Sequence, residues 1–279
     1  MSRQSIYRGK NRYREFLSAA NIIATKIGQI KEVVGILATG GIGRGFCDYY
    51  SDLDLIVYAD DAHVRRIDQY IAVGYLRYKG IELDTPVESY QKALAARSPS
   101  RLWSQVVRWD RQNSRLLHDT DNRIADLLTE KLVFPDSEQR RLLARYRKEV
   151  DEQLSYNFQM RVKRGRRHHM AACLIRAIQH IILWIYAKNK QFQPYLPKWL
   201  FYHLDHQSVP EARYLDRLKN AYTNPATTVT QAKNVHADLM RLCHQIGLKH
   251  HLSDIEMLFK QHERNWGKAN ERTRHYLSW

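Results

Sequence analysis

The chain has 279 residues, 44% of them apolar and 11% aromatic, which is enough for one large or two smaller packed domains and excludes wholesale disorder. Its 45 Lys and Arg residues outnumber 29 Asp and Glu residues, and the resulting charge of +16 favours anionic ligands such as nucleoside triphosphates, RNA or DNA. Three scattered cysteines (Cys47, Cys173 and Cys243) without a Cys-x-x-Cys pair indicate a reducing compartment and argue against a disulfide scaffold or a zinc ribbon.

The amino-terminal region predicts an amphipathic helix. Residues 1–14 are polar and basic and lack the apolar segment of a secretory signal, so we expect a cytoplasmic protein. From Asn11 to Ile30, apolar residues recur every three or four positions, which is the spacing of a helix with one buried face.

The next stretch carries the chemistry. An apolar run over Val33–Leu37 predicts a buried strand, and Gly40, Gly41, Gly43 and Gly45 then form a glycine-rich turn that opens a short helix over Ile42–Cys47. A second strand over Leu53–Tyr58 follows directly. Asp52 and Asp54 flank Leu53, and residues i and i+2 of a strand share a face, so the two carboxylates should point the same way.

Paired carboxylates and a glycine turn predict two kinds of ligand. Two carboxylates held side by side repel each other, so a fold keeps them mainly where a divalent cation neutralises the pair. Backbone N–H groups in a glycine-rich turn that opens a helix suit a bound phosphate. Metal and phosphate on adjoining elements outline a site for a nucleoside triphosphate.

The predicted strand is followed in order by Gly40-Gly41, Gly43-Arg44-Gly45 and Ser51-Asp52-Leu53-Asp54. This order resembles the nucleotidyltransferase superfamily with the polymerase beta-like fold. It is most similar to the small bacterial aminoglycoside and lincosamide nucleotidyltransferases that carry a helical carboxyl-terminal domain. The resemblance implies that Asp52 and Asp54 hold one or two Mg²⁺ ions against the triphosphate. Gly40, Gly41, Arg44 and Ser51 would contact its phosphates, although Arg44 and Ser51 could instead pair or cap locally.

A third carboxylate is expected on a later strand. Ile81, Leu83 and Thr85 alternate with Glu82 and Asp84, which predicts a strand with one acidic face that ends near Pro86. In the resembled family a third acid on such a strand completes the metal site, and it could also accept the proton of the attacking hydroxyl. Glu82 and Asp84 share a face and both remain candidates; Glu82, between two apolar residues, is favoured.

From Val87 the pattern is helical almost to the end. Helices are predicted over 87–96, 101–111, 122–132, 137–163, 167–188, 197–204, 211–222, 228–247 and 252–276, with a short strand or turn over Arg115–Asp119. We therefore expect an α+β fold: a small mixed-sheet catalytic domain over residues 1–120 and an all-α acceptor-binding domain over 121–279.

Two further segments are candidates for ligand contact. Residues 161–169 form the strongest basic cluster, which could bind a triphosphate, a phosphorylated acceptor or an RNA backbone, or could be a solvated helix junction. The segment 189–200 resembles a loop that presents aromatic and lysine side chains beside the active site in the resembled enzymes. There Lys198 would meet phosphate and Tyr195 would line the acceptor pocket, unless both simply pack a helix connection.

Other enzyme classes lack their motifs. The thirteen histidines include no His-Glu-x-x-His, no Gly-x-Ser-x-Gly occurs, and the glycine turn does not continue into Gly-Lys-Ser/Thr or a dinucleotide-binding pattern.

The sequence thus predicts a Mg²⁺-dependent enzyme that moves a nucleoside monophosphate, most readily AMP from ATP, onto a hydroxyl of a small molecule such as an aminoglycoside or lincosamide antibiotic. This activity would confer antibiotic resistance. Two alternatives stay open: nucleotidylation of RNA, tRNA or a protein, which the charge favours, and a catalytically silent regulator that binds nucleotide or RNA. The intact Asp52-x-Asp54 pair disfavours the regulator.

Overall fold

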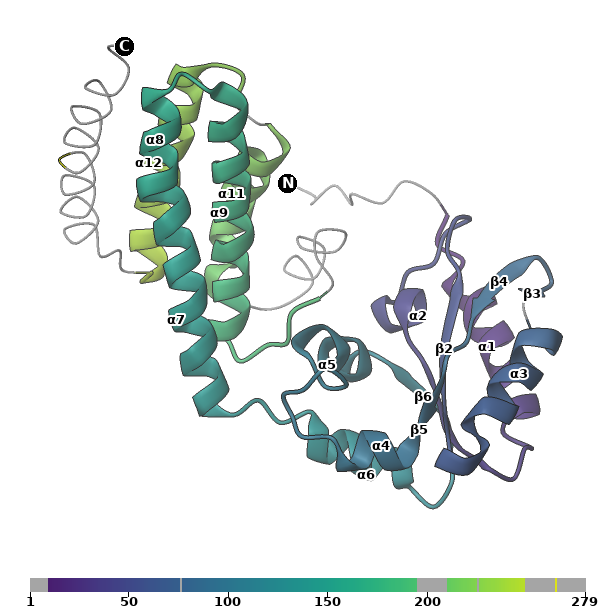
Figure 1. Ribbon diagram of the computed structural model, residues 1–279. Coiled ribbons are helices and arrows are strands. Elements are labelled where there is room, and N and C mark those ends of the chain that lie inside the picture. The colour runs from purple at the N-terminus through teal and green to yellow at the C-terminus, as the bar shows by residue number, and fades with distance from the viewer. Residues whose placement is uncertain (1–9, 76, 195–209, 225, 249–263, 265–279) are drawn as a thin grey trace, which may run out of the picture. The chain divides into compact units, whose positions relative to one another are not determined.

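The computed structural model describes residues 10–75, 77–194, 210–224, 226–248 and 264, and the chain divides into two compact units. Unit 1 comprises Met1–Phe134 and Phe192–Tyr195, and unit 2 comprises Pro135–Gln191 and Leu196–Trp279. The combination of a mixed sheet in unit 1 and helices in unit 2 confirms the α+β class (Figure 1).

Unit 1 is organised around strand β2. Its sheet has the order β3-β4-β2-β1-β6, and β5 pairs with β2 outside this path. β1 runs antiparallel to β2 and β6, whereas β4 and β5 both run parallel to β2. The strands are β1 Val33–Ala38, β2 Leu53–Ala59, β3 Arg77–Tyr78, β4 Ile81–Asp84, β5 Val87–Ser89 and β6 Arg115–Asp119.

Helices cover both faces of this sheet, with α1 and α3 on one side of β2 and α4 and α6 on the other (Figure 1). The helices of unit 1 are α1 Tyr13–Ile27, α2 Gly40–Arg44, α3 Val64–Gly74 with a preceding 3-10 turn Asp61–His63, α4 Tyr90–Ala95, α5 Gln105–Gln112 and α6 Arg123–Lys131. α1, β1 and β2 lie where the apolar periodicity predicts them.

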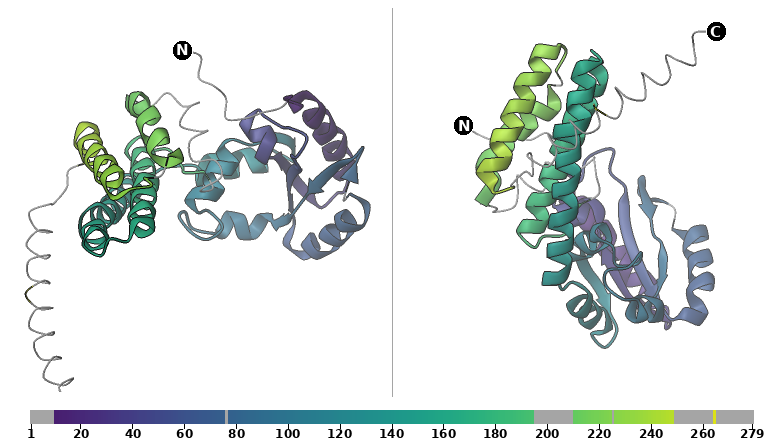
Figure 2. Two further views of the ribbon diagram at one scale, coloured as in Figure 1. Left: turned by 90° about the horizontal axis from the view of Figure 1, so that it is seen from above. Right: turned by 60° about the vertical axis from the view of Figure 1, so that its left-hand side comes forward.

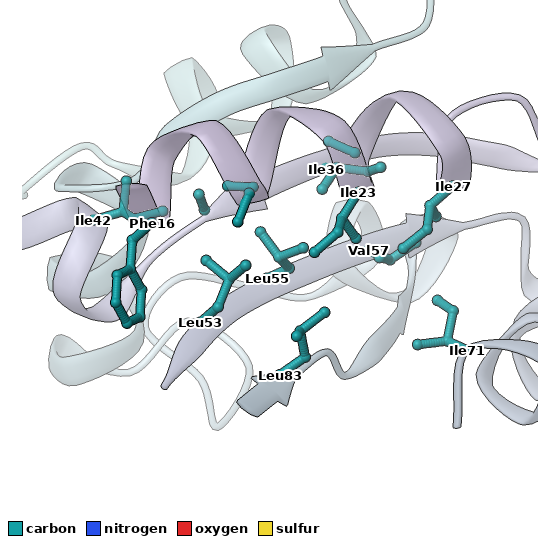
Figure 3. Close-up of a cluster of buried hydrophobic side chains, with 14 of the residues drawn as sticks. Phe16, Ile23, Ile27, Ile36, Ile42, Leu53, Leu55, Val57, Ile71 and Leu83 are labelled. Carbon is teal, nitrogen blue, oxygen red and sulfur yellow. The ribbon is translucent and has the colours of Figure 1, made fainter. Parts of the chain in front are cut away.

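Alternation along β2 separates two cores. Leu53, Leu55 and Val57 point toward α1, where they join Phe16 and Ile23 in one buried cluster (Figure 3). Burying side chains of this size contributes roughly 1.5–3 kcal/mol each.

The other face of β2 packs against later helices. Ile56 and Tyr58 join Trp103, Ile124 and Leu127 in a second buried cluster. Asp54 alternates with Leu53 and Leu55, so it lies on this second face, toward the elements that follow β4.

Two helix predictions after residue 86 were wrong at their amino ends. The predicted helix over 87–96 begins with β5, because Val87 and Ser89 pair with Val57 and Ala59 of β2 before α4 starts. The predicted helix over 101–111 starts only at Gln105, where the Ser104 hydroxyl accepts a hydrogen bond from the Val107 N–H.

The two units divide later than the predicted boundary at residue 120. α6 follows that position, yet its Ile124 and Leu127 are buried in the second core of unit 1. Unit 1 therefore continues to Phe134, and it also includes Phe192, whose ring stacks on Phe134 with centroids 5.2 Å apart.

Unit 2 is a helical bundle around α9 (Figure 2). Its elements are α7 Asp136–Glu152, the π-helical turn η2 Gln153–Asn157, α8 Phe158–Lys163, α9 Arg167–Lys188, the 3-10 turn η3 Pro210–Tyr214, α11 Leu215–Thr223 and α12 Val229–Ile246. The helices predicted over 197–204 and 252–276 lie outside the described residues.

Among the described residues, α9 is the one helix that is long and apolar enough to be a membrane-span candidate. By length and composition alone it could cross a membrane, but 67% of its most apolar window is buried inside the bundle. We interpret it as the central helix of unit 2.

Candidate functional site

The site is built at the entrance of β2. Asp52 immediately precedes the strand and Asp54 is its second residue. Leu53 and Leu55 are fully buried on the α1 side, so burial of these two residues fixes the direction of Asp54. The backbone is tied to the preceding turn as well, since the Thr39 N–H donates to the Asp54 carbonyl over 3.0 Å.

The Asp54 carboxyl is buried among other acids. Burial, followed by the charges of Asp52, Asp110 and Asp84, raises its pKa from 3.8 to about 7, against the opposing effect of Arg44. The charges of Asp52, Asp84 and Asp110 therefore all act on the Asp54 carboxyl. A site that stores this much repulsion between acids suits a bound cation.

Of the two acids of β4, Asp84 lies opposite Asp54. β4 runs parallel to β2 with Leu53 opposite Leu83 and Asp54 opposite Asp84, so the last two side chains emerge next to each other on the same face. Glu82 lies two residues before Asp84 on β4, and in the strand register it is opposite Arg77 of β3. Only Asp84 of these two candidates contributes to the shifted pKa of Asp54.

The glycine turn brings α2 against the acids. Gly40 has a φ of +52°, and a Cβ there would lie 1.5 Å from Oδ2 of Asp54. At Gly43, a Cβ would lie 2.5 Å from the Asn113 carbonyl at the end of α5. Both positions exclude a side chain, which explains two glycines of the motif as requirements of close approach.

Unit 1 therefore arranges strand, glycine turn, short helix and acidic strand in the order that the sequence motif predicts. β1 leads into the glycine turn and α2, and β2 returns beside β1 with Asp52 and Asp54 at its start.

Asp110 belongs to the same site and was missed by the sequence prediction. Its carboxylate on α5 accepts a hydrogen bond from the Gly40 N–H, and Arg111 donates to it over 2.9 Å. Burial raises the pKa of Asp110, while Arg111, the Gly40 hydrogen bond and Arg44 lower it.

Arg111 anchors α5 on the sheet. Its buried guanidinium donates to the Tyr58 hydroxyl over 3.0 Å and to the Glu88 carboxylate over 2.7 Å. A sequence signal for this network existed: α5 carries two arginines on its packed face, and buried arginines require acceptors. The identity of those acceptors depends on the tertiary fold.

Ser51 and Arg44 have different surroundings. The Ser51 hydroxyl donates to Oδ1 of Asp48 and accepts the Asp48 N–H, so it closes a local turn before β2. Arg44 lies near the acids, since its charge lowers the pKa of both Asp54 and Asp110. Of the two, Arg44 remains the phosphate-binding candidate.

The remaining candidates lie elsewhere. Tyr195 and Lys198 are outside the described residues. The basic cluster 161–169 belongs to unit 2, at the turn between α8 and α9. The cysteines Cys47, Cys173 and Cys243 are buried and unpaired, and burial raises the pKa of Cys47 to about 12, so it is not a nucleophile.

The donor set fits Mg²⁺ with an incomplete protein shell. Among the described residues, no three His, Cys, Asp or Glu side chains are close enough to form a complete metal site. Mg²⁺ is commonly held by one or two carboxylates, with substrate phosphates and water filling the other positions. Asp54, whose pKa is raised by the charge of Asp52, and Asp52 itself match that kind of site.

Comparison with known protein families gave a match to part of the chain. A family described as "Domain of unknown function (DUF4037)" matches residues 87–200. No match was found among curated protein sequences.

Two solved structures are similar to this chain. One is a nucleotidyltransferase-like protein from Exiguobacterium sibiricum 255-15, with 13% identity over 82% of this chain and 74% of that one and a TM-score of 0.44. The other is the spectinomycin adenyltransferase AAD(9) from Enterococcus faecialis, solved with ATP and spectinomycin, with 11% identity over 81% of this chain and 99% of that one and a TM-score of 0.34.

Proposed function

We propose that this chain is a Mg²⁺-dependent nucleotidyltransferase that transfers AMP from ATP to a hydroxyl group and releases pyrophosphate. The observation that carries the proposal is the position of Asp54. Its carboxyl is buried against Gly40 of the glycine turn, and the charges of Asp52 and Asp84 raise its pKa. A pair of acids suited to a cation therefore lies next to a turn whose backbone N–H groups suit a phosphate.

The proposed roles follow from the side-chain chemistry. Asp52 and Asp54 would hold Mg²⁺, which when bound neutralises the phosphate charge and orients the triphosphate. Arg44 would bind phosphate oxygens. Asp84 takes the role for which Glu82 was favoured from sequence: it would orient the acceptor hydroxyl and take its proton.

The transfer step is a displacement at the α-phosphorus. The acceptor oxygen forms a bond to this phosphorus, the bond to the bridging oxygen of the β-phosphate breaks, and pyrophosphate leaves. The acceptor proton passes to the Asp84 carboxylate. Positioning and charge neutralisation, rather than covalent chemistry by the protein, would supply most of the rate.

For the acceptor we propose a small molecule with free hydroxyl groups, such as an aminoglycoside or lincosamide. The spectinomycin adenyltransferase among the similar solved structures was solved with ATP and spectinomycin. A second candidate is nucleotidylation of RNA, which is supported by the net charge of +16.

A transfer assay tests the proposal. The protein is incubated with each α-labelled nucleoside triphosphate, Mg²⁺ and separate pools of aminoglycosides, lincosamides, tRNA and cell protein. We expect label transfer to one pool with stoichiometric pyrophosphate, reduced by at least about 100-fold in both Asp52→Asn and Asp54→Asn. Pyrophosphate release that survives both substitutions would refute the site, and absence of transfer with tight RNA binding would favour a regulator.

A further inference from the structure

The positive charge of the chain is concentrated in unit 2. Unit 1 contains 20 Lys and Arg residues against 16 Asp and Glu residues, which leaves 25 against 13 for unit 2. The unit with the acidic site is therefore close to neutral, and the excess charge requires an explanation outside that site.

Part of the positive charge of unit 2 lies on two helices that contain no acid. No Asp or Glu occurs in the sequence between Glu152 and Asp205, a stretch that includes α8 and the whole of α9. Ion pairs within one helix need an acid three or four residues from the base, so α8 and α9 cannot form any. Acids on the neighbouring α7 and α12, such as Glu152 and Asp238, have other partners: Glu152 pairs with Lys148, and Asp238 pairs with Arg217 and Arg241.

The turn between α8 and α9 presents these charges to solvent. We call it the basic turn; all of its side chains are exposed: Lys163, Arg164, Arg166, Arg167, His168 and His169. Among the described residues, Arg164, Arg166 and Arg167 have no acidic partner. By contrast, Arg161 turns inward and hydrogen-bonds the thiol of Cys173.

The backbone of the basic turn is well defined. Gly165 has a φ of +63°, and the N–H groups of Arg164, Gly165 and Arg166 donate to carbonyls of the last turn of α8 over 3.0–3.2 Å. A fixed turn reduces the entropy lost when its three arginines engage a ligand. The start of α12 lies at the same end of the bundle, because His236 stacks on Phe158 of α8 at 4.3 Å and α12 begins seven residues before it (Figures 1 and 2). Its first turn contributes no acid, and Lys233 follows in the second.

We propose that the basic turn binds the phosphodiester backbone of a nucleic acid. Guanidinium groups bind phosphate oxygens in pairs of parallel hydrogen bonds, and three unpaired arginines within four residues match consecutive phosphates of one strand. The basic turn belongs to unit 2, and this proposal does not depend on the transfer activity proposed for unit 1.

Salt dependence of binding tests the proposal. The full-length protein is titrated into a labelled 20-nucleotide RNA, and into DNA of the same sequence to separate the two sources, without Mg²⁺ or nucleotide at several salt concentrations. The test variant is Arg164→Ser/Arg166→Ser/Arg167→Ser. Since each phosphate contact on a single strand contributes about 0.7 to the slope of log K against log salt, we expect the slope to fall by about 2 and the affinity by at least about tenfold.

A matched control removes three exposed arginines from unit 1: Arg65→Ser/Arg77→Ser/Arg97→Ser. We expect it to change the affinity less than twofold, and Asp54→Asn to retain full binding. Equal losses of affinity in both triple variants would show that binding depends on net charge alone, and would overturn the proposal. Binding of anionic phosphatidylserine vesicles in place of RNA and DNA, lost in the test variant alone, would also overturn it in favour of a membrane surface.

Discussion

At the scale of single residues, the site rests on a carboxyl group held where it is costly to ionise. Asp54 is buried beside Gly40 and faces the charges of Asp52, Asp84 and Asp110. The pair Asp52 and Asp54 could be predicted from the sequence because strand alternation is a local property. Which acid of β4 lies opposite Asp54 could not be predicted, because Glu82 and Asp84 share a face and only the register of β4 against β2 distinguishes them.

Asp54 makes the stability of the metal-free protein depend on pH. Its pKa rises from 3.8 in the unfolded chain to about 7 in the fold, so its ionisation opposes folding increasingly from about pH 4 to pH 7. The full cost, at most about 4 kcal/mol, applies above pH 7. We therefore expect Asp54→Asn to unfold at higher urea concentration than the wild type at pH 8 and at the same concentration at pH 4. A difference that is constant across this range would contradict the raised pKa.

The choice between the two acids of β4 is testable by paired substitutions. We expect Asp84→Asn to lower nucleotidyl transfer by at least about 100-fold, because it removes the carboxylate opposite Asp54 on β4. Glu82→Gln is the matched control and should retain transfer within about threefold. The reverse pattern in steady-state rates would restore Glu82 as the third acid.

Gly40 is predicted to tolerate no side chain. Gly40→Ala would place a Cβ 1.5 Å from the Asp54 carboxylate at a positive φ, so we expect loss of transfer and a lower melting temperature. Gly165→Ala, which also has a positive φ but meets no atom within 4 Å, controls for backbone strain alone. If both variants lose the same stability, the contact with Asp54 has no energetic role.

At the scale of elements, α5 and β5 connect the acidic site to the rest of unit 1. The helical pattern from Val87 concealed β5, because the three residues of this strand pair with β2 through their backbones and leave no periodicity in the sequence. Likewise, the contacts of α5 with Gly40, Glu88 and Tyr58 join segments far apart in sequence. By contrast, β6 and α9 have the bounds that the sequence predicts, since their signals are local.

The ionic network of α5 should be strongly coupled. Removing Arg111 would leave Glu88 and the buried Asp110 without their cation, so we expect Arg111→Leu to lower the free energy of unfolding by roughly 3 kcal/mol. The double variant Arg111→Leu/Glu88→Leu should lose less, because it leaves fewer charges unpaired. Urea denaturation measures both values, and strictly additive losses would show that the groups are independent.

At the scale of the whole molecule, the two units divide the charge and, as we propose, the tasks. Unit 1 holds the acids and the glycine turn, and unit 2 carries most of the positive charge. The sequence predicted a sheet unit followed by a helical unit but placed their boundary too early, because the burial of α6 on the sheet of unit 1 depends on packing rather than on composition.

Nucleotide binding tests the central claim most directly. The affinity of a non-hydrolysable ATP analogue is measured by calorimetry across a Mg²⁺ titration for the wild type, Asp54→Asn and Glu82→Gln. The account predicts tight binding by the wild type only with Mg²⁺, at least about tenfold weaker binding by Asp54→Asn, and unchanged binding by Glu82→Gln. Binding of equal affinity by the wild type and Asp54→Asn, independent of Mg²⁺, would contradict it.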